Sequence, residues 1–270
     1  MPLGDHLREL RGRLLKAGAA IILGSIAGWF LYEPFFEALQ QPVRRVKAER
    51  GESIVTIAFT DVSSPFNLKL KLSIYMGLVA ASPVWLYQLW AFIVPGLNRR
   101  EKRHALGFVA AAVPLFLSGI FLAWLILPNA VLFLTAFTPE GTANVIPADT
   151  YISFVTRLML VFGIAFVIPL FLVALSLLGL VRAVTLAKGW RIAVFLIFLF
   201  AAMASPTPDA GSMLAMAFPM VGLYMIAVGV AWLIDRRRAK NNPFTELDDD
   251  EASPLEEDRY RVDASPDDPL

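Results

Sequence analysis

The sequence predicts an all-α membrane protein with six transmembrane helices, and three observations lead to this fold class. Hydrophobic residues make up 57% of the 270 residues and charged residues only 17%, a balance that a water-soluble domain of this length does not normally carry. Six apolar stretches have lengths near the roughly 20 residues that a crossing helix needs. Basic residues are concentrated on one side of the membrane that these stretches would cross, as expected for cytoplasmic loops.

The six apolar stretches are candidate membrane helices. They cover residues 15–32, 72–94, 105–137, 151–180, 190–204 and 212–234. The first follows basic residues as a signal peptide would, but it has no small-residue cleavage site, so we expect it to be retained. The third and fourth exceed the crossing length and contain prolines, so we expect them to tilt or kink. The fifth would be a short span, since about 15 residues make only about 23 Å of helix.

The orientation follows from the basic residues. One side receives fifteen Lys and Arg: Arg8, Arg11, Arg13, Lys16, Arg99, Arg100, Lys102, Arg103, Arg182, Lys188, Arg191, Arg236, Arg237, Arg238 and Lys240. The other side has six, in or next to one long loop: Arg44, Arg45, Lys47, Arg50, Lys69 and Lys71. Both termini are therefore predicted to be cytoplasmic.

The chain divides into two parts by charge. Residues 1–240 carry 22 basic and 12 acidic residues, whereas residues 241–270 carry 2 and 11. The second part also has few large apolar side chains, so it cannot bury enough surface to offset the entropy of ordering. We predict a six-span membrane domain over 1–240 and an acidic, disordered cytoplasmic tail over 241–270.

Several function classes lack the residues they need. There is no cysteine and there are only two histidines, so we expect no metal and no cofactor. No phosphate-binding GxxxxGK[ST] loop, HExxH motif or GxSxG elbow occurs. Arg157 is the one charged residue clearly inside a span, and it would extend to the interface or pair with Asp149. A secondary transporter or channel for small solutes remains the main alternative, and an intramembrane enzyme is less favoured.

Two carboxylates lie in otherwise basic cytoplasmic segments. They are Glu9 in HLRELRGRL and Glu101 in GLNRREKRH. Each allows a simple explanation, because Glu9 can pair with Arg13 one helical turn away and Glu101 with a neighbouring Arg. A pair of carboxylates would also suit a guanidinium ligand, because the planar fork of Arg donates two parallel hydrogen bonds that Lys cannot reproduce.

Four sequence blocks resemble the TatC family, the receptor component of the twin-arginine protein translocase. They are DHLRELRGRL at 5–14, TDVSSPFNLKLKLS at 60–73, SPVWLYQLWAFIVPGLNRREKR at 82–103 and SPTPD at 205–209. The third block is highly specific, and the match runs in order from residue 5 to residue 235. The resemblance implies a concave, glove-like bundle of six helices, with short fifth and sixth spans, in a bacterial-type cytoplasmic membrane.

The resemblance also implies a function and partners. The chain would be the receptor for twin-arginine signal peptides and the core subunit of a translocase that exports folded proteins and is driven by the proton-motive force. It would act as a homo-oligomer within a larger complex that contains single-span subunits of the TatA and TatB type. Neither a covalent reaction nor nucleic-acid binding is implied.

The same resemblance assigns site residues. The signal-peptide contacts would be Glu9, Leu10, Arg11, Phe92, Pro95, Leu97, Glu101 and Arg103. Positions linked with assembly or structure would be Pro65, Asp209 and Met213, with Arg157 as a further candidate. Pro65 and Asp209 have an equally simple explanation, as a turn proline and a helix cap.

Two positions depart from the family pattern. Val167 stands where relatives usually carry a membrane-embedded glutamate, and Met213 stands where some carry a polar amide thought to meet the single-span partners. If the glutamate binds a polar group of a partner in relatives, this chain must do so otherwise, through Arg157 or not at all. The choice of partner is therefore less well defined than the receptor function.

Overall fold

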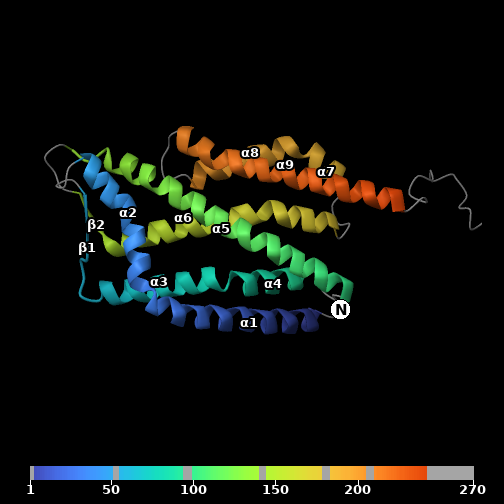
Figure 1. Ribbon diagram of the computed structural model, residues 1–270, viewed down its shortest axis with the longest axis horizontal. Coiled ribbons are helices and arrows are strands. Elements are labelled where there is room, and N and C mark those ends of the chain that lie inside the picture. The colour runs from blue at the N-terminus through green and yellow to red at the C-terminus, as the bar shows by residue number, and fades with distance from the viewer. Residues whose placement is uncertain are drawn as a thin grey trace, which may run out of the picture.

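The computed structural model describes residues 3–50, 55–93, 99–139, 144–177, 183–204 and 210–241, and these ranges contain nine helices and two strands. In chain order (Figure 1) the elements are α1 Leu3–Phe30, α2 Tyr32–Arg50, β1 Val55–Ala58, α3 Ser64–Ala80, α4 Ser82–Ile93, α5 Arg99–Thr135, β2 Asn144–Pro147, α6 Ala148–Leu177, α7 Ala183–Lys188, α8 Trp190–Ala204 and α9 Ala210–Asn241. The predicted tail, 241–270, lies almost wholly outside the described residues.

The described helices confirm a multi-span membrane protein. Four are long and apolar enough to cross a bilayer, in the ranges Leu7–Phe30, Leu106–Thr135, Ala148–Leu177 and Met216–Arg237. Helices α3 and α4 would add a fifth span as one bent unit. Helix α8 has the 15 residues predicted for the fifth stretch, with the same bounds, and is a shorter apolar helix. The structure thus supports four or five spans by length, and a sixth crossing requires α8.

The expected short sixth span is wrong. Helix α9 has 32 residues, and its apolar part, Met216–Arg237, is long enough to cross a membrane alone. The helix continues past the apolar part because the sequence DRRRAKN consists mostly of good helix formers and contains neither Gly nor Pro. Helix α5 is longer still, with 37 residues, and it runs obliquely across its neighbours (Figure 1). The predicted tilt of the third stretch agrees with this course.

The second apolar stretch is divided into two helices. Helices α3 and α4 meet at an angle of 60° next to Pro83, whose ring excludes a regular helical turn. A bend inside the membrane leaves backbone carbonyls without their helical partners. The indole Nε1 of Trp85 donates a hydrogen bond of 3.0 Å to the Leu78 carbonyl, so a side chain of α4 satisfies an acceptor of α3.

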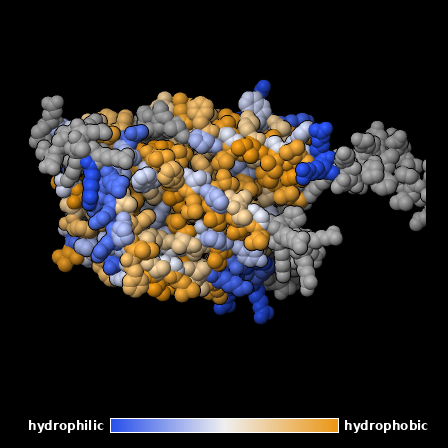
Figure 2. Space-filling model, in the orientation of Figure 1, coloured by the Kyte–Doolittle hydropathy of each residue, from blue (hydrophilic) through white to orange (hydrophobic). Residues whose placement is uncertain are grey.

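Polar groups gather at the two ends of the molecule, and hydrophobic side chains cover the middle (Figure 2). The starts of α1 and α5 and the end of α9 lie together, and we call this the terminal end (Figure 1). The opposite end, which we call the sheet end, carries α2 and the parallel pair β1–β2, in which Val55 is in register with Asn144. The two ends of the described chain thus share one end of the molecule.

The sheet end contains structure that the sequence patterns did not predict. The long loop after the first span folds into α2 and β1, and β1 pairs with β2 from the loop before α6. The buried hydroxyl of Tyr151 on α6 donates to the Leu39 carbonyl of α2 at 2.8 Å, which ties this helix to the core. The strands β1 and β2 are almost 90 residues apart in the sequence, so no local sequence pattern indicates that they pair. Helix α2 has a polar surface, as expected of a helix outside the membrane, so it does not appear as an apolar stretch.

Small residues let two helices approach closely. Gly24 of α1 faces Gly77 of α3, where an added Cβ on Gly24 would lie 2.9 Å from the Gly77 carbonyl oxygen. Gly28, one turn further on, faces the backbone of Ser73. A small-xxx-small spacing of this kind is a common route to tight packing in membranes, where lipid competes with every larger apolar contact.

Candidate functional site

Glu9 lies in the second turn of α1, at the terminal end. The Nε of Arg13 donates to Glu9 Oε1 at 3.0 Å, and a second guanidinium nitrogen donates to the same oxygen. The sequence predicted this pairing from the spacing of four residues. The Glu9 side chain stays 29% exposed, and among the described residues no donor lies on its second oxygen, Oε2. Arg13 therefore holds this carboxylate through one oxygen only.

An apolar groove of about 370 Å³ has a lining that begins on α1 at Leu10, the residue after Glu9. Leu10 and Phe92, both predicted contact residues, line it, and Arg13 lies at its polar margin. Along α1 the lining continues to Ile21, about 16 Å further into the membrane at 1.5 Å per residue. Trp85 and Ile164 form part of its walls, so α1, α4 and α6 enclose an apolar path that starts at the terminal end.

The walls of the groove show a helical period that the motif analysis missed. On α4 the lining residues Trp85, Leu89 and Phe92 recur at intervals of three and four, which places them on one helix face. On α1 the lining runs through Leu10, Leu14, Ala17 and Ile21 at the same kind of spacing. Such a stripe predicts an apolar helix face. It does not predict whether that face packs against another helix or lines an open groove.

The remaining predicted contact residues are only partly placed. Glu101 and Arg103 lie in the first two turns of α5, which starts at the terminal end, as does α1 (Figure 1). Their side chains, and all of Pro95 and Leu97, lie outside the described part of the chain. Arg11 is exposed on α1 next to Leu10. The two helix starts that carry the two candidate acids thus share one end of the molecule, as a joint site requires.

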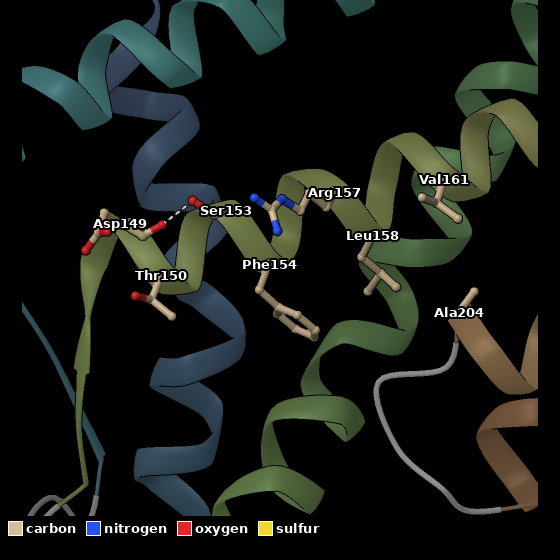
Figure 3. Close-up of a pocket in the computed structure, with 8 residues that line it drawn as sticks. All are labelled: Asp149, Thr150, Ser153, Phe154, Arg157, Leu158, Val161 and Ala204. Carbon is tan, nitrogen blue, oxygen red and sulfur yellow. Dashed lines mark hydrogen bonds between the residues drawn. The ribbon is translucent and has the colours of Figure 1, made fainter.

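Arg157 lines a different pocket, near the sheet end (Figure 3). This pocket has a volume of about 510 Å³ and lies along α6, with Ala204 of α8 on its far wall. The Arg157 side chain extends along α6 toward Ser153, and the carboxylate of Asp149 lies on the far side of Ser153 (Figure 3). No ion pair joins Arg157 to Asp149 within the described ranges. The side chain therefore extends toward the start of α6, while the predicted pairing with Asp149 is absent from these ranges.

The assembly candidates occupy different surroundings. Pro65 is exposed in the first turn of α3, where proline is well tolerated because that turn needs no amide donor. Met213 packs, half-buried, against the main core. Asp209 lies outside the described residues.

Val167 is part of the protein interior. It is 3% exposed and belongs to a buried apolar cluster with Trp90, Phe108 and Phe116, which joins α4, α5 and α6. The position where the family resemblance led us to expect a glutamate is therefore filled by hydrocarbon packing.

Comparisons with known proteins agree on one family. A sequence model of the family described as Sec-independent protein translocase protein (TatC) matches residues 5–219. The Sec-independent protein translocase protein TatC of Xylanimonas cellulosilytica is 49% identical over 88% of this chain and 86% of its own length. The corresponding protein of Rothia mucilaginosa is 39% identical over 94% of this chain and 86% of its own.

A solved structure gives the same answer for the fold. A crystal structure of a twin-arginine translocase receptor, TatC, superposes with a TM-score of 0.67 at 33% identity, and the match covers 86% of this chain and all of that one. The family match and the helices long enough to cross a bilayer identify a multi-pass membrane protein with a transport function rather than an enzymatic one. The chain belongs to the TatC family of Sec-independent protein translocase subunits, as its sequence motifs predicted.

Proposed function

We propose that this chain is the receptor for twin-arginine signal peptides and that Glu9 and Glu101 together bind the two guanidinium groups. The observation that carries the proposal is the Glu9 carboxylate, which Arg13 holds through Oε1 and whose neighbours Leu10 and Arg13 line an apolar groove. A guanidinium presents paired donors to a carboxylate, and Arg13 holds only one oxygen of Glu9. A solved relative is described as a twin-arginine translocase receptor, which supports the same assignment.

The groove suggests where the rest of the signal would lie. An apolar segment that follows the arginines would pass Leu10 and Phe92 and continue toward Trp85 and Ile21. About 11 residues of helix would span this path of about 16 Å. Burial of that segment would supply affinity, and the carboxylates would supply the preference for Arg over Lys.

In the full assembly we propose a membrane domain of six spans over residues 1–240, an acidic cytoplasmic tail over 241–270, and both termini in the cytoplasm. Helix α8 then crosses the membrane as a short span, and the concave side of the bundle carries the groove. The translocase exports folded proteins with the proton-motive force and includes single-span TatA- and TatB-type subunits, with several copies of this chain. Pro65, Asp209 and Met213 would contribute to that assembly.

A binding experiment tests the receptor site. The purified protein is titrated with a twin-arginine signal peptide and with the same peptide carrying two lysines. We expect at least about tenfold tighter binding of the arginine peptide, because bidentate charged hydrogen bonds contribute more than single ones. Glu9→Gln and Glu101→Ala should each remove this preference.

Glu37→Gln is the matched control, because Glu37 is an exposed acid of α2, at the sheet end (Figure 1). It should leave both affinities unchanged. If the two peptides bind equally well to every variant, the carboxylate mechanism is wrong while the family assignment stands.

A further inference from the structure

Arg157 and Lys71 lie close together on two helices. Lys71 of α3 donates its Nζ to Ser153 Oγ of α6 at 2.7 Å. Arg157, one helical turn beyond Ser153, extends its side chain toward that same serine (Figure 3). Both side chains are exposed. Two cations thus flank one serine on the surface of the molecule.

The depth of these cations matches a lipid headgroup. Helix α6 has 30 residues, about 45 Å, so about 7 Å would project beyond a hydrocarbon core of about 30 Å at each end. The Cα of Arg157, nine residues beyond Ala148, would then lie about 6 Å below the boundary at the sheet end, a distance that its side chain can cover. Lys69, two residues before Lys71, lies 4.6 Å above the Trp29 ring, and such aromatic residues mark the interface.

No carboxylate within the described ranges neutralises either cation. The ion pair within those ranges joins Glu9 to Arg13, and it lies at the terminal end, opposite the sheet end. Asp149 lines the same pocket, but its carboxylate lies across Ser153 from the Arg157 guanidinium (Figure 3). An exposed cation at the membrane surface therefore has an unmet preference for an anion, and here two cations outnumber one acid.

The pocket beside Arg157 has the polarity of a phospholipid. Its rim toward the sheet end carries Thr150, Ser153 and Arg157, and its deeper wall is formed by Phe154, Leu158 and Val161. A phosphate at the rim would accept paired hydrogen bonds from the guanidinium fork, and the first part of an acyl chain would cover the apolar wall. The volume of about 510 Å³ accommodates such a group.

We propose that Lys71 and Arg157 bind the phosphate of an anionic phospholipid in the leaflet at the sheet end. This pocket and the signal-peptide groove share no lining residue, so the lipid proposal does not depend on the receptor proposal. The lipid would link α3 to α6 and would stabilise the bundle against thermal unfolding, since it binds the folded chain only.

Lipid binding to the delipidated protein tests this proposal. The purified chain in a neutral detergent is titrated with phosphatidylglycerol or phosphatidylcholine, and bound lipid is counted by native mass spectrometry while the thermal unfolding midpoint is recorded. We expect phosphatidylglycerol to bind at least about tenfold more tightly than phosphatidylcholine and to raise the thermal unfolding midpoint. Arg157→Gln and Lys71→Gln should each remove most of that difference.

Lys69→Gln is the matched control, because it removes the same charge at the same level of α3 but from the side that faces Trp29. It should leave the lipid preference intact, and circular dichroism should confirm that every variant is folded. Equal binding of the two lipids to the wild-type chain would overturn the proposal. Equal losses in all three variants, or an identical rise of the midpoint with inorganic phosphate alone, would overturn it as well.

Discussion

At the residue scale, the receptor proposal depends on how Arg13 holds Glu9. Both guanidinium contacts lie on Oε1, so Arg13 fixes the orientation of the carboxylate and does not occupy Oε2. A partly exposed ion pair contributes about 0.2–1 kcal/mol. Arg13 is therefore a positioning residue, and its loss should have a smaller effect than loss of Glu9.

We expect Arg13→Gln to weaken binding of the twin-arginine peptide by about two- to fivefold, in line with the energy of such a pair. The preference over the twin-lysine peptide should remain, because Glu9 and Glu101 are unchanged. Titration of both peptides against the purified variant measures this. Tighter binding of the arginine peptide would mean that Arg13 competes with the ligand for Glu9.

Val167 allows a second prediction at this scale. An ionised carboxylate at a position with 3% exposure, among Trp90 and Phe116, would have no partner and would cost several kcal/mol. Val167→Glu should therefore lower the thermal unfolding midpoint more than Val167→Ala, which only opens a small cavity. Melting of the two variants in the same detergent compares them. A Glu variant at least as stable as wild type would show that the chain keeps a polar site there.

The candidate site was predictable from sequence in part only. The Glu9–Arg13 pair follows from local spacing on one helix, and the assignment of both acids to one site is a prediction from the family motifs. The groove did not follow, because its walls combine residues as far apart as Leu10 and Ile164, which only the packed bundle brings together. Lys71 was counted as a loop charge, since nothing local connects it with Ser153.

At the element scale, the bend between α3 and α4 is held by one side-chain hydrogen bond. Trp85 donates to the Leu78 carbonyl, and its ring packs edge-on against Phe116 with centroids 5.4 Å apart. Trp85→Phe keeps an aromatic ring but removes the donor. In an apolar environment the unpaired carbonyl would cost about 1–3 kcal/mol.

We therefore expect Trp85→Phe to lower the thermal unfolding midpoint of the detergent-solubilised chain. Trp232→Phe is the matched control, since Trp232 is 51% exposed on α9 and should tolerate the change. The same decrease in both variants would show that the hydrogen bond from Trp85 to Leu78 does not stabilise the fold. The bend would then depend on Pro83 alone.

The ends of a helix were predictable where helix-breaking residues flank an apolar stretch. Residues 190–204 follow Gly189 and precede Ser205 and Pro206, and α8 has those bounds. The run at 72–94 was predicted as one membrane helix because it contains no charged residue, so the 60° bend next to Pro83 was not predicted. Helix α2 and the β1–β2 pair were missed because the loops that form them are ordered by tertiary contacts such as Tyr151 with Leu39.

At the scale of the whole molecule, the membrane topology depends on α8. Whether α8 crosses decides on which side of the membrane α9 ends. The start of α1 and the end of α9 share the terminal end (Figure 1), which requires an even number of crossings. Helices α1, α5, α6 and α9 and the bent pair α3–α4 account for five. In the six-span arrangement that we propose, the sixth is α8, whose 15 residues reach only about 23 Å, so the bilayer would have to thin around it.

The chain contains no cysteine, so single cysteines report topology without a background. We expect Lys188→Cys and Ala210→Cys, which flank α8, to react with a membrane-impermeant maleimide from opposite sides of the cell membrane. Ala210→Cys should label in intact spheroplasts together with Val62→Cys, which lies before α3 and is fully exposed. Lys188→Cys should label only after the membrane is opened, as should Arg237→Cys near the end of α9. Labelling of both positions around α8 from one side would show that α8 does not cross, and α9 would then end on the opposite side from the start of α1.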